Sequence, residues 1–321
     1  MGVSRDLQRK IRRTEETLGQ AVLGQEALVR GLLIGLLADG HVLIEGVPGL
    51  AKTRAVHLLA RACQLDFKRL QFTPDLLPAD VVGTRIYNQQ SASFEVVRGP
   101  VFANFVLADE INRAPAKVQS ALLETMQERQ VTLGRETHRL PSPFLVFATQ
   151  NPIEQEGTYP LPEAQLDRFL IKLVVSYPSK EHEPEIVRLV LGEGEAPAVE
   201  ETLTADEVLT LQRSTADVFL EPRVIRYATE IVQATRNPGD YGLSLAPYVE
   251  LGASPRASIA LAKAAQARAL IEERGSATPD DVKGVAHDVL RHRVLTTYYA
   301  DAEGVRSERI IDEILATVKV P

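Results

Sequence analysis

The stretch HVLIEGVPGLAKTRAVHLLARA occupies residues 41–62 and decides the fold. Its apolar start, residues 41–46, predicts a buried strand, and residues 52–62 have the spacing of a helix. The glycine-bearing turn between them is typical of a loop that binds phosphate groups. Backbone N–H groups of such a turn point inward, and the new helix directs its positive end at the same place.

We assign the whole turn to nucleotide binding, with eight residues: Gly46, Val47, Pro48, Gly49, Leu50, Ala51, Lys52 and Thr53. Lys52 is expected to reach the β- and γ-phosphates of ATP, and the Thr53 hydroxyl to ligate Mg²⁺. Ala51 stands where the general G-x-x-x-x-G-K-[ST] pattern has glycine. We expect Ala51 to keep a negative φ, because only then is its methyl group tolerated. The alternative, a chance glycine-rich turn, is disfavoured by the flanking strand and helix.

Further apolar runs predict four more strands, at residues 67–72, 105–109, 144–149 and 169–175. Because these runs are apolar almost throughout, we expect a parallel sheet covered by helices on both faces. Residues 84–98 and 130–140 instead alternate with period two around a polar centre, which predicts β-hairpins. Whether these hairpins are solvated elements without a special role stays open at this point.

The second half of the chain has helical patterns after a Gly/Pro/Glu linker at residues 193–201. Thr204 and Glu207 form a capping box, and Ser254 precedes a proline at a helix start. The expected helices span residues 204–219, 221–236, 254–274, 278–295 and 307–318, with a loop at 237–252. We therefore predict an α/β parallel-sheet core with β-hairpin inserts at residues 1–180, followed by a small all-α lid domain at residues 181–321.

The composition is that of an ordinary globular chain of 321 residues, with 45% hydrophobic and 25% charged residues. The net charge is −7, and residues 181–321 carry the acidic excess, with 15 Lys and Arg against 24 Asp and Glu. This balance argues against a broad basic face that grips nucleic acid. We expect no membrane span and no secretory signal. The single cysteine, Cys63, excludes an internal disulfide, so we expect a reducing cytoplasm.

The segment FVLADE, residues 105–110, is an apolar strand that ends in two carboxylates. Asp109 is expected to hold the Mg²⁺ shell, and Glu110 to polarise the attacking water as a general base. Two acids after a strand are also common in surface turns. Their position in the third predicted strand, after the loop at residues 46–53, favours the catalytic interpretation.

Three later residues are candidates for sensing or completing a phosphate site. Asn151, in the segment TQNP, can orient water, although Asn before Pro is also a turn former. Arg168 is a candidate for the arginine that phosphoryl transfer borrows from a neighbour, or it merely pairs with Asp167. Arg256 lies in the first turn of a predicted helix, where a cation opposes the helix dipole. A solvated first-turn residue is its plainer interpretation.

The motifs GVPGLAKT, FVLADE, ATQNP, LPEAQLDRF and SPRA together resemble the AAA+ ATPases, and specifically the MoxR family. Residues 109–133 and the alanine in the phosphate loop are especially similar to that family. The resemblance covers residues 22–175 and continues more loosely through the predicted lid.

The resemblance implies an ATP hydrolase that forms a ring, usually a hexamer, with ATP at subunit junctions. It implies that Lys52 and Thr53 bind ATP and Mg²⁺, that Asp109 and Glu110 are the Walker B pair, and that Asn151 is sensor 1. It also implies that Arg168 is an arginine finger and that Arg256 is sensor 2, while Gly24 and Gln25 lie near the adenine. The two hairpins point toward the central pore in relatives.

For partners, the resemblance implies a protein client and a protein with a von Willebrand factor A domain. The expected activity is chaperone-like remodelling or maturation of a client complex, driven by ATP. Two alternatives remain open: a DNA-directed AAA+ motor, related to helicases or loaders, and a nucleotide-gated switch that seldom hydrolyses. The acidic balance disfavours the first, and the intact acidic pair disfavours the second.

Overall fold

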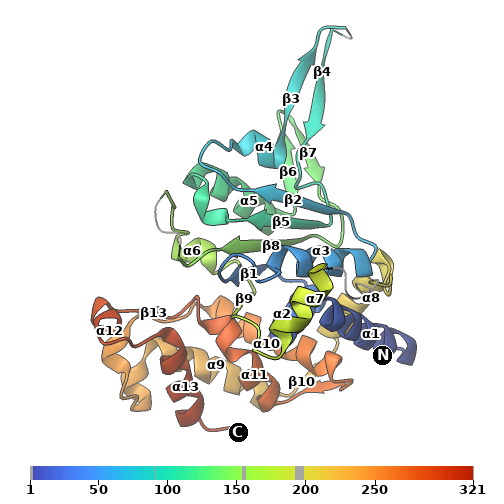
Figure 1. Cartoon of the computed structure of the whole chain (residues 1–321). Coiled ribbons are helices and arrows are strands. Elements are labelled where there is room, and N and C mark those ends of the chain that lie inside the picture. Colours follow the sequence, from blue (N-terminus) through green and yellow to red (C-terminus); the bar gives the residue numbers. More distant parts are fainter. Residues whose placement is uncertain (1–2, 91, 154–156, 192–198, 321) are drawn as a thin grey trace.

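A computed structural model describes residues 3–90, 92–153, 157–191 and 199–320. Its centre is a five-stranded, wholly parallel sheet in the order β2-β5-β8-β1-β9 (Figure 1). The strands are β2 (Phe67–Gln71), β5 (Phe105–Asp109), β8 (Leu145–Gln150), β1 (Val42–Glu45) and β9 (Ile171–Val174). The predicted α/β class and the five predicted strands are confirmed.

Both faces of this sheet are covered. Alternate residues of β5 enter different apolar clusters, with Phe105 and Leu107 in one and Val106 and Ala108 in the other. The first cluster contains residues of α1 (Arg5–Ala21), α2 (Glu26–Leu37) and α3 (Lys52–Ala62), and the second those of α4 (Pro78–Val82) and α5 (Ala116–Glu128). Burial on both faces explains why the central strands β5 and β8 are mostly apolar, whereas the edge strand β2 carries the exposed Lys68 and Arg69.

The two predicted β-hairpins are present. They are formed by β3 (Gly83–Asn88) with β4 (Ser93–Arg98), and by β6 (Gln130–Leu133) with β7 (Glu136–Arg139). Figure 1 shows the β3–β4 hairpin projecting from the body of the molecule, away from the C-terminal helices. It exposes four large apolar side chains: Ile86, Tyr87, Phe94 and Val97.

The C-terminal part is mainly helical and packs beside β9 (Figure 1). Its helices are α8 (Ala205–Ala216), α9 (Pro222–Arg236), α10 (Pro255–Ile271), α11 (Pro279–Leu290), α12 (Tyr298–Ala302) and α13 (Ser307–Thr317). Short strands pair β10 (Phe219–Leu220) with β12 (Ser276–Ala277), and β11 (Val249–Leu251) with β13 (Leu295–Thr296). The remaining short elements are η1 (Ile111–Arg113), α6 (Glu163–Leu166), α7 (His182–Leu191), η2 (Pro238–Tyr241) and η3 (Ala246–Tyr248).

Several expected boundaries in the C-terminal part need correction. The helix expected at 204–219 ends at Ala216, because Phe219 lies in β10, and the helix expected at 254–274 ends at Ile271. The short helix α12 was not expected. The helix expected at residues 278–295 ends at Leu290, because the chain turns there to place Leu295 in β13. The stretch 237–252, expected as a loop, contains two short 3₁₀ helices and a strand. Helix α7 was not expected at all. The expected linker at 193–201 falls mostly outside the described residues.

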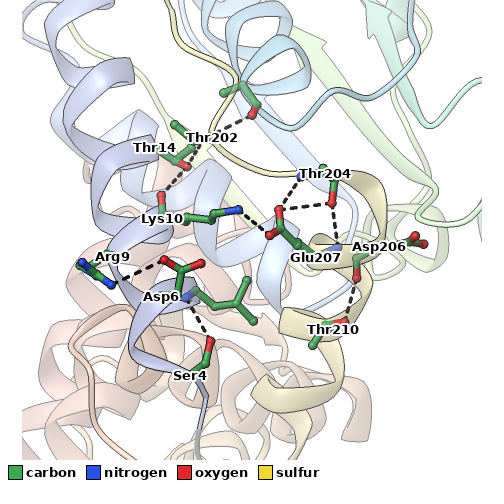
Figure 2. Close-up of polar contacts among 12 residues, drawn as sticks. Ser4, Asp6, Arg9, Lys10, Thr14, Thr202, Thr204, Asp206, Glu207 and Thr210 are labelled. Carbon is green, nitrogen blue, oxygen red and sulfur yellow. Dashed lines mark hydrogen bonds and ion pairs between the residues drawn. The ribbon is translucent and has the colours of Figure 1, made fainter.

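Helix α1 carries a cluster of four basic residues, Arg9, Lys10, Arg12 and Arg13, all of them exposed to solvent except the half-buried Lys10. Lys10 pairs with Glu207 of α8, and Arg12 with Glu273 just after α10 (Figure 2 shows the Lys10 pair). Beneath these pairs, the buried hydroxyls of Thr14 and Thr202 lie 2.6 Å apart. Helix α1 is therefore held to the acidic C-terminal part, where the excess of carboxylates supplies its partners.

Figure 2 also shows the capping box that the sequence predicts at the start of α8. The Glu207 amide donates to the Thr204 hydroxyl at 3.3 Å, and the Thr204 amide donates to the Glu207 carboxylate at 2.9 Å. Cys63 is fully buried in the first apolar cluster, where burial raises its pKa to about 12. Within the described residues, no helix is long and apolar enough to cross a bilayer.

His41 is a buried link between the sheet and α5. Its Nδ1 accepts a hydrogen bond from the Val146 amide at 2.9 Å, so Nε2 carries the proton and donates to the Met126 carbonyl at 3.1 Å. Burial lowers the pKa of His41 to about 4 and lowers that of His292 well below its usual value. Both imidazoles are therefore neutral in the folded protein near pH 7.

We predict that the free energy of unfolding falls as the pH drops from about 6.5 to about 4. The unfolded chain binds protons at its histidines in this window, whereas folded His41 does not, so its share of the loss is about 3 kcal/mol. Urea unfolding at stepped pH values measures this. His41→Gln should remove that share of the pH dependence, while His287→Gln, at a half-buried histidine of α11, should leave it. An unchanged pH dependence in His41→Gln would contradict the prediction.

Candidate functional site

Most of the predicted nucleotide-binding residues line one cavity of about 390 Å³ at the carboxyl edge of the sheet. The cavity is lined by residues 48–54 of the loop after β1 and the first turn of α3, by Asp109 at the end of β5 and Glu110 just after it, and by residues 149–151 at the end of β8. The carboxyl ends of parallel strands meet at one edge, which is where open α/β sheets bind ligands. The structure thus brings together residues far apart in the sequence.

The loop before α3 is shaped by its glycines and by Lys52. A Cβ at Gly46 would lie 2.8 Å from the Val175 carbonyl oxygen, so no larger residue fits beside β9. Gly49 has φ +87°. The Lys52 ammonium donates to the carbonyls of Gly46 and Val47, which holds the side chain across the loop. Burial lowers the pKa of Lys52, while the charges of the carboxylates in the cavity oppose this.

The backbone of Ala51 does not have the negative φ that the sequence analysis expected. It adopts a left-handed conformation, with φ +56° and ψ 17°, at the N-cap of α3. The left-handed conformation costs roughly 1–2 kcal/mol for a residue with a Cβ. The chain has to turn sharply from the loop into the helix at this residue, and the surrounding fold holds the strain.

One threonine orients both acidic residues after β5. The Thr149 hydroxyl donates to Asp109 Oδ1 at 2.5 Å and accepts from the Glu110 amide at 2.9 Å. Glu110 itself has φ +56°, so the chain turns immediately after the strand and separates the two side chains. The Thr53 hydroxyl lies 3.5 Å from Asp109 Oδ2, which places the two expected magnesium ligands side by side.

Polar residues that the motif analysis did not identify complete the cavity. Arg69 of β2 donates to Asp109 Oδ2 from Nε at 3.0 Å and from Nη2 at 2.7 Å. Gln71 of the same strand donates to Glu110 Oε2 at 2.8 Å, and Arg113 donates to that oxygen at 3.0 Å. A signal was present in the segment FKRLQF, residues 67–72, because three of its six residues are polar although it was predicted as a buried strand.

Asn151 lies at the end of β8 with its side chain 7% exposed, and it lines the same cavity. Its Oδ1 accepts from the Ile153 amide at 3.2 Å. This is the local turn that Asn favours before a proline. The turn and the position in the cavity are therefore compatible, because the same side chain satisfies both.

Gly24 and Gln25 line a separate, smaller cavity of about 130 Å³ that also includes Ser176. Gln25 Nε2 donates to the Ser176 carbonyl at 3.0 Å. Ser176 follows Val175, whose carbonyl faces Gly46 of the phosphate loop. The backbone of residues 175–176, just after β9, therefore contacts the phosphate loop on one side and lines the small cavity on the other.

Arg168 and Arg256 lie elsewhere. Both line a third cavity, of about 280 Å³, together with Arg293 and with residues 39–41 before β1. Arg168 directly precedes β9, so this cavity lies at the amino edge of the sheet, opposite the phosphate loop. Arg168 Nη1 donates to the Leu123 carbonyl at 2.6 Å, and Arg168 Nε is buried without a hydrogen-bond partner.

Comparisons with known proteins agree with this arrangement. Residues 41–171 match the ATPase family associated with various cellular activities (AAA), and residues 244–314 match the AAA lid domain. The chain is 51% identical to Chaperone MoxR1 of Mycobacterium tuberculosis over 94% of this chain and 79% of that protein. It is 32% identical to Protein MoxR of Paracoccus denitrificans over 98% of both chains.

The chain belongs to the MoxR family of AAA+ ATPases. The crystal structure of a candidate ATPase from Cytophaga hutchinsonii is similar to this chain, with a TM-score of 0.91 and 49% sequence identity. The match covers 98% of this chain and 96% of that one. The loop at residues 46–53 and the acids after β5 fall within the matched ATPase segment of this MoxR-family chain, and Arg256 within its lid segment.

The strain at Ala51 gives a stability prediction. Ala51→Gly removes the left-handed strain but gives the unfolded chain more freedom, so we expect a net stabilisation of up to about 1 kcal/mol. Ala121→Gly, inside α5, is the matched control and should destabilise by about 1 kcal/mol. Urea unfolding of both variants measures the difference. Equal destabilisation by the two changes would show that Ala51 is not strained.

Proposed function

We propose that this MoxR-family protein hydrolyses ATP and uses the energy for chaperone-like remodelling or maturation of a client protein complex. The observation that carries the proposal is the convergence of Lys52, Asp109 and Glu110 on one cavity at the carboxyl edge of the sheet. A cation for phosphates, a carboxylate for a metal and a carboxylate for water are the groups that phosphoryl transfer to water requires.

The residues present fit a magnesium ion. Thr53 and Asp109 present oxygen atoms to each other at 3.5 Å, and oxygen is the ligand type that Mg²⁺ prefers. Asp109 Oδ2 already accepts a cationic group, the Arg69 guanidinium, which shows that positive charge is favoured there. When bound, Mg²⁺ would neutralise negative charge on the phosphate oxygens.

In the proposed mechanism, a water oxygen bonds to the γ-phosphorus while the bond from that phosphorus to the bridging oxygen breaks and ADP leaves, and Glu110 accepts the proton that the water loses. Asn151 orients that water, and Lys52 stabilises the negative charge that develops on the phosphate oxygens. Gln71 and Arg113 both bond to Oε2 of Glu110, so Oε1 can accept the proton while these two contacts hold the carboxylate in place. Thr149 keeps the adjacent Asp109 in place during this proton transfer.

We propose that Arg168 and Arg256 act on the nucleotide of an adjacent subunit. Their shared cavity lies at the amino edge of the sheet, and the phosphate loop lies at the carboxyl edge. Strands β1 and β9 separate the two edges, and a strand of four residues is about 13 Å long. Neither arginine therefore reaches the phosphate loop of its own subunit without a large rearrangement.

We propose that the subunits form a hexameric ring in the cytoplasm, because arginines that act on a neighbour leave no site incomplete only when the assembly closes. We further propose that the core spans residues 1–180 and the lid spans residues 181–321. Gly24 and Gln25 would contact the adenine. The proposed partner is a protein with a von Willebrand factor A domain. The exposed apolar residues of the β3–β4 hairpin support contact with a protein client. The comparisons give no support to a DNA-directed motor.

The role of Glu110 has a direct test. Glu110→Gln should retain ATP binding and lower steady-state phosphate release by at least about 10²-fold, because the base is lost while the phosphate contacts remain. Glu124→Gln, an exposed position of α5, is the control and should keep wild-type turnover. Turnover that survives in Glu110→Gln would remove Glu110 from the mechanism.

The action of the arginines across the junction is tested with mixed rings. Arg168→Ala and Arg256→Ala should each bind ATP but hydrolyse it slowly, by about 10³-fold or more for Arg168. Mixing either variant with Glu110→Gln should restore activity, because about a quarter of junctions in a random equimolar ring then join an intact site to intact arginines. If activity does not return in the mixture, the arginines act within their own subunit.

A further inference from the structure

Arg293 is the most heavily bonded cation of the described residues outside the phosphate loop, and neither the motifs nor the family assignment gives it a role. It follows α11, and its side chain is only 3% exposed. The guanidinium makes five hydrogen bonds, four of them to the segment that leads into β9. An arginine has five N–H donors, so the whole group is used.

These bonds go to residues on both sides of Arg168 in the chain. Arg293 donates to the Asp167 carboxylate at 2.7 Å, to the Asp167 carbonyl at 3.1 Å and to the Phe169 carbonyl at 2.5 Å. It also donates to the Leu170 carbonyl at 3.1 Å. The backbone immediately before and after Arg168 is therefore fixed by one side chain from the lid.

The same carboxylate reaches Arg256. The Ser254 hydroxyl donates to the other oxygen of Asp167, Oδ2, at 2.8 Å. That hydroxyl also caps α10 by accepting from the Arg256 amide at 3.1 Å. A continuous chain of bonds thus runs from Arg293 through Asp167 and Ser254 to Arg256, and it joins the segment of Arg168 to the start of α10.

We propose that Arg293 is a positioning residue that holds Arg168 and Arg256 as one rigid unit, presented to the nucleotide of the next subunit. The inference rests on the proposed function, because it assumes that these arginines act across a junction. All three arginines line the same cavity of about 280 Å³. A movement of the lid helices α10 and α11 then displaces both functional arginines together, so lid position controls hydrolysis at the neighbouring site.

The experiment uses the full chain with Asp167→Asn and Arg293→Gln. Asp167→Asn keeps the size of the side chain and removes the charge pair, so it tests the proposal even if Arg293→Gln does not fold. Both variants should bind ATP with unchanged affinity and lose about 10²-fold in turnover, as expected for displaced catalytic groups. Arg291→Gln is the control, because Arg291 is a largely buried arginine two residues away that forms ion pairs with Asp288 and Glu308 and donates to the Lys172 carbonyl instead.

Mixed rings separate positioning from general damage. Asp167→Asn should regain activity when mixed with Glu110→Gln, which supplies intact arginines, and should not regain it when mixed with Arg168→Ala. Arg291→Gln should keep near wild-type turnover. Full activity of Asp167→Asn alone, loss of its ATP binding, or failure of Glu110→Gln to restore it would each overturn the proposal. If the reference mixture of Arg168→Ala with Glu110→Gln also stays inactive, the proposed action across the junction fails instead.

Discussion

The parallel pairing of β1, β5 and β8 is the constraint on which the candidate site depends. The register of β1 with β8 places Glu45 beside Gln150, and that of β2 with β5 places Gln71 beside Asp109, so the ends of separate strands reach one edge together. Only then does the loop after β1 face the acids after β5. The pairing is stable because both faces of the sheet are buried, and burial of apolar area is the main favourable term in folding.

The same polarity separates the two groups of functional residues. Side chains that follow strands meet the phosphate loop, whereas Arg168, which precedes β9, lies at the opposite edge with Arg256. In the function proposed above, the ATP site lies on one edge of the subunit and the two arginines act from the other edge. On that proposal a single subunit cannot complete its own site, because the arginines it needs belong to a neighbour.

Much of this was predictable because the decisive signals are local. Apolar runs predict the strands, and the loop and the acidic pair lie within a few residues of strand ends. The left-handed φ of Ala51 was not predictable, since it is imposed by tertiary structure on a residue that disfavours it. Arg69 and Arg293 were missed because their partners, Asp109 and Asp167, are 40 and 126 residues away in the chain. The pairing of the N-terminal cluster with lid carboxylates was missed for the same reason.

Long-range contacts of this kind determine how freely the lid can move relative to the sheet. One apolar cluster runs without interruption from α1–α3 into α8–α11, and buried Thr14 and Thr202 bond across it. A lid held by such a cluster cannot swing freely, because opening would expose apolar surface to water. Small rotations that keep the cluster intact are the accessible motions. Since Arg293 fastens the segment of Arg168 to this lid, a small rotation of the lid would move that segment with it, which is the basis of the positioning role proposed for Arg293.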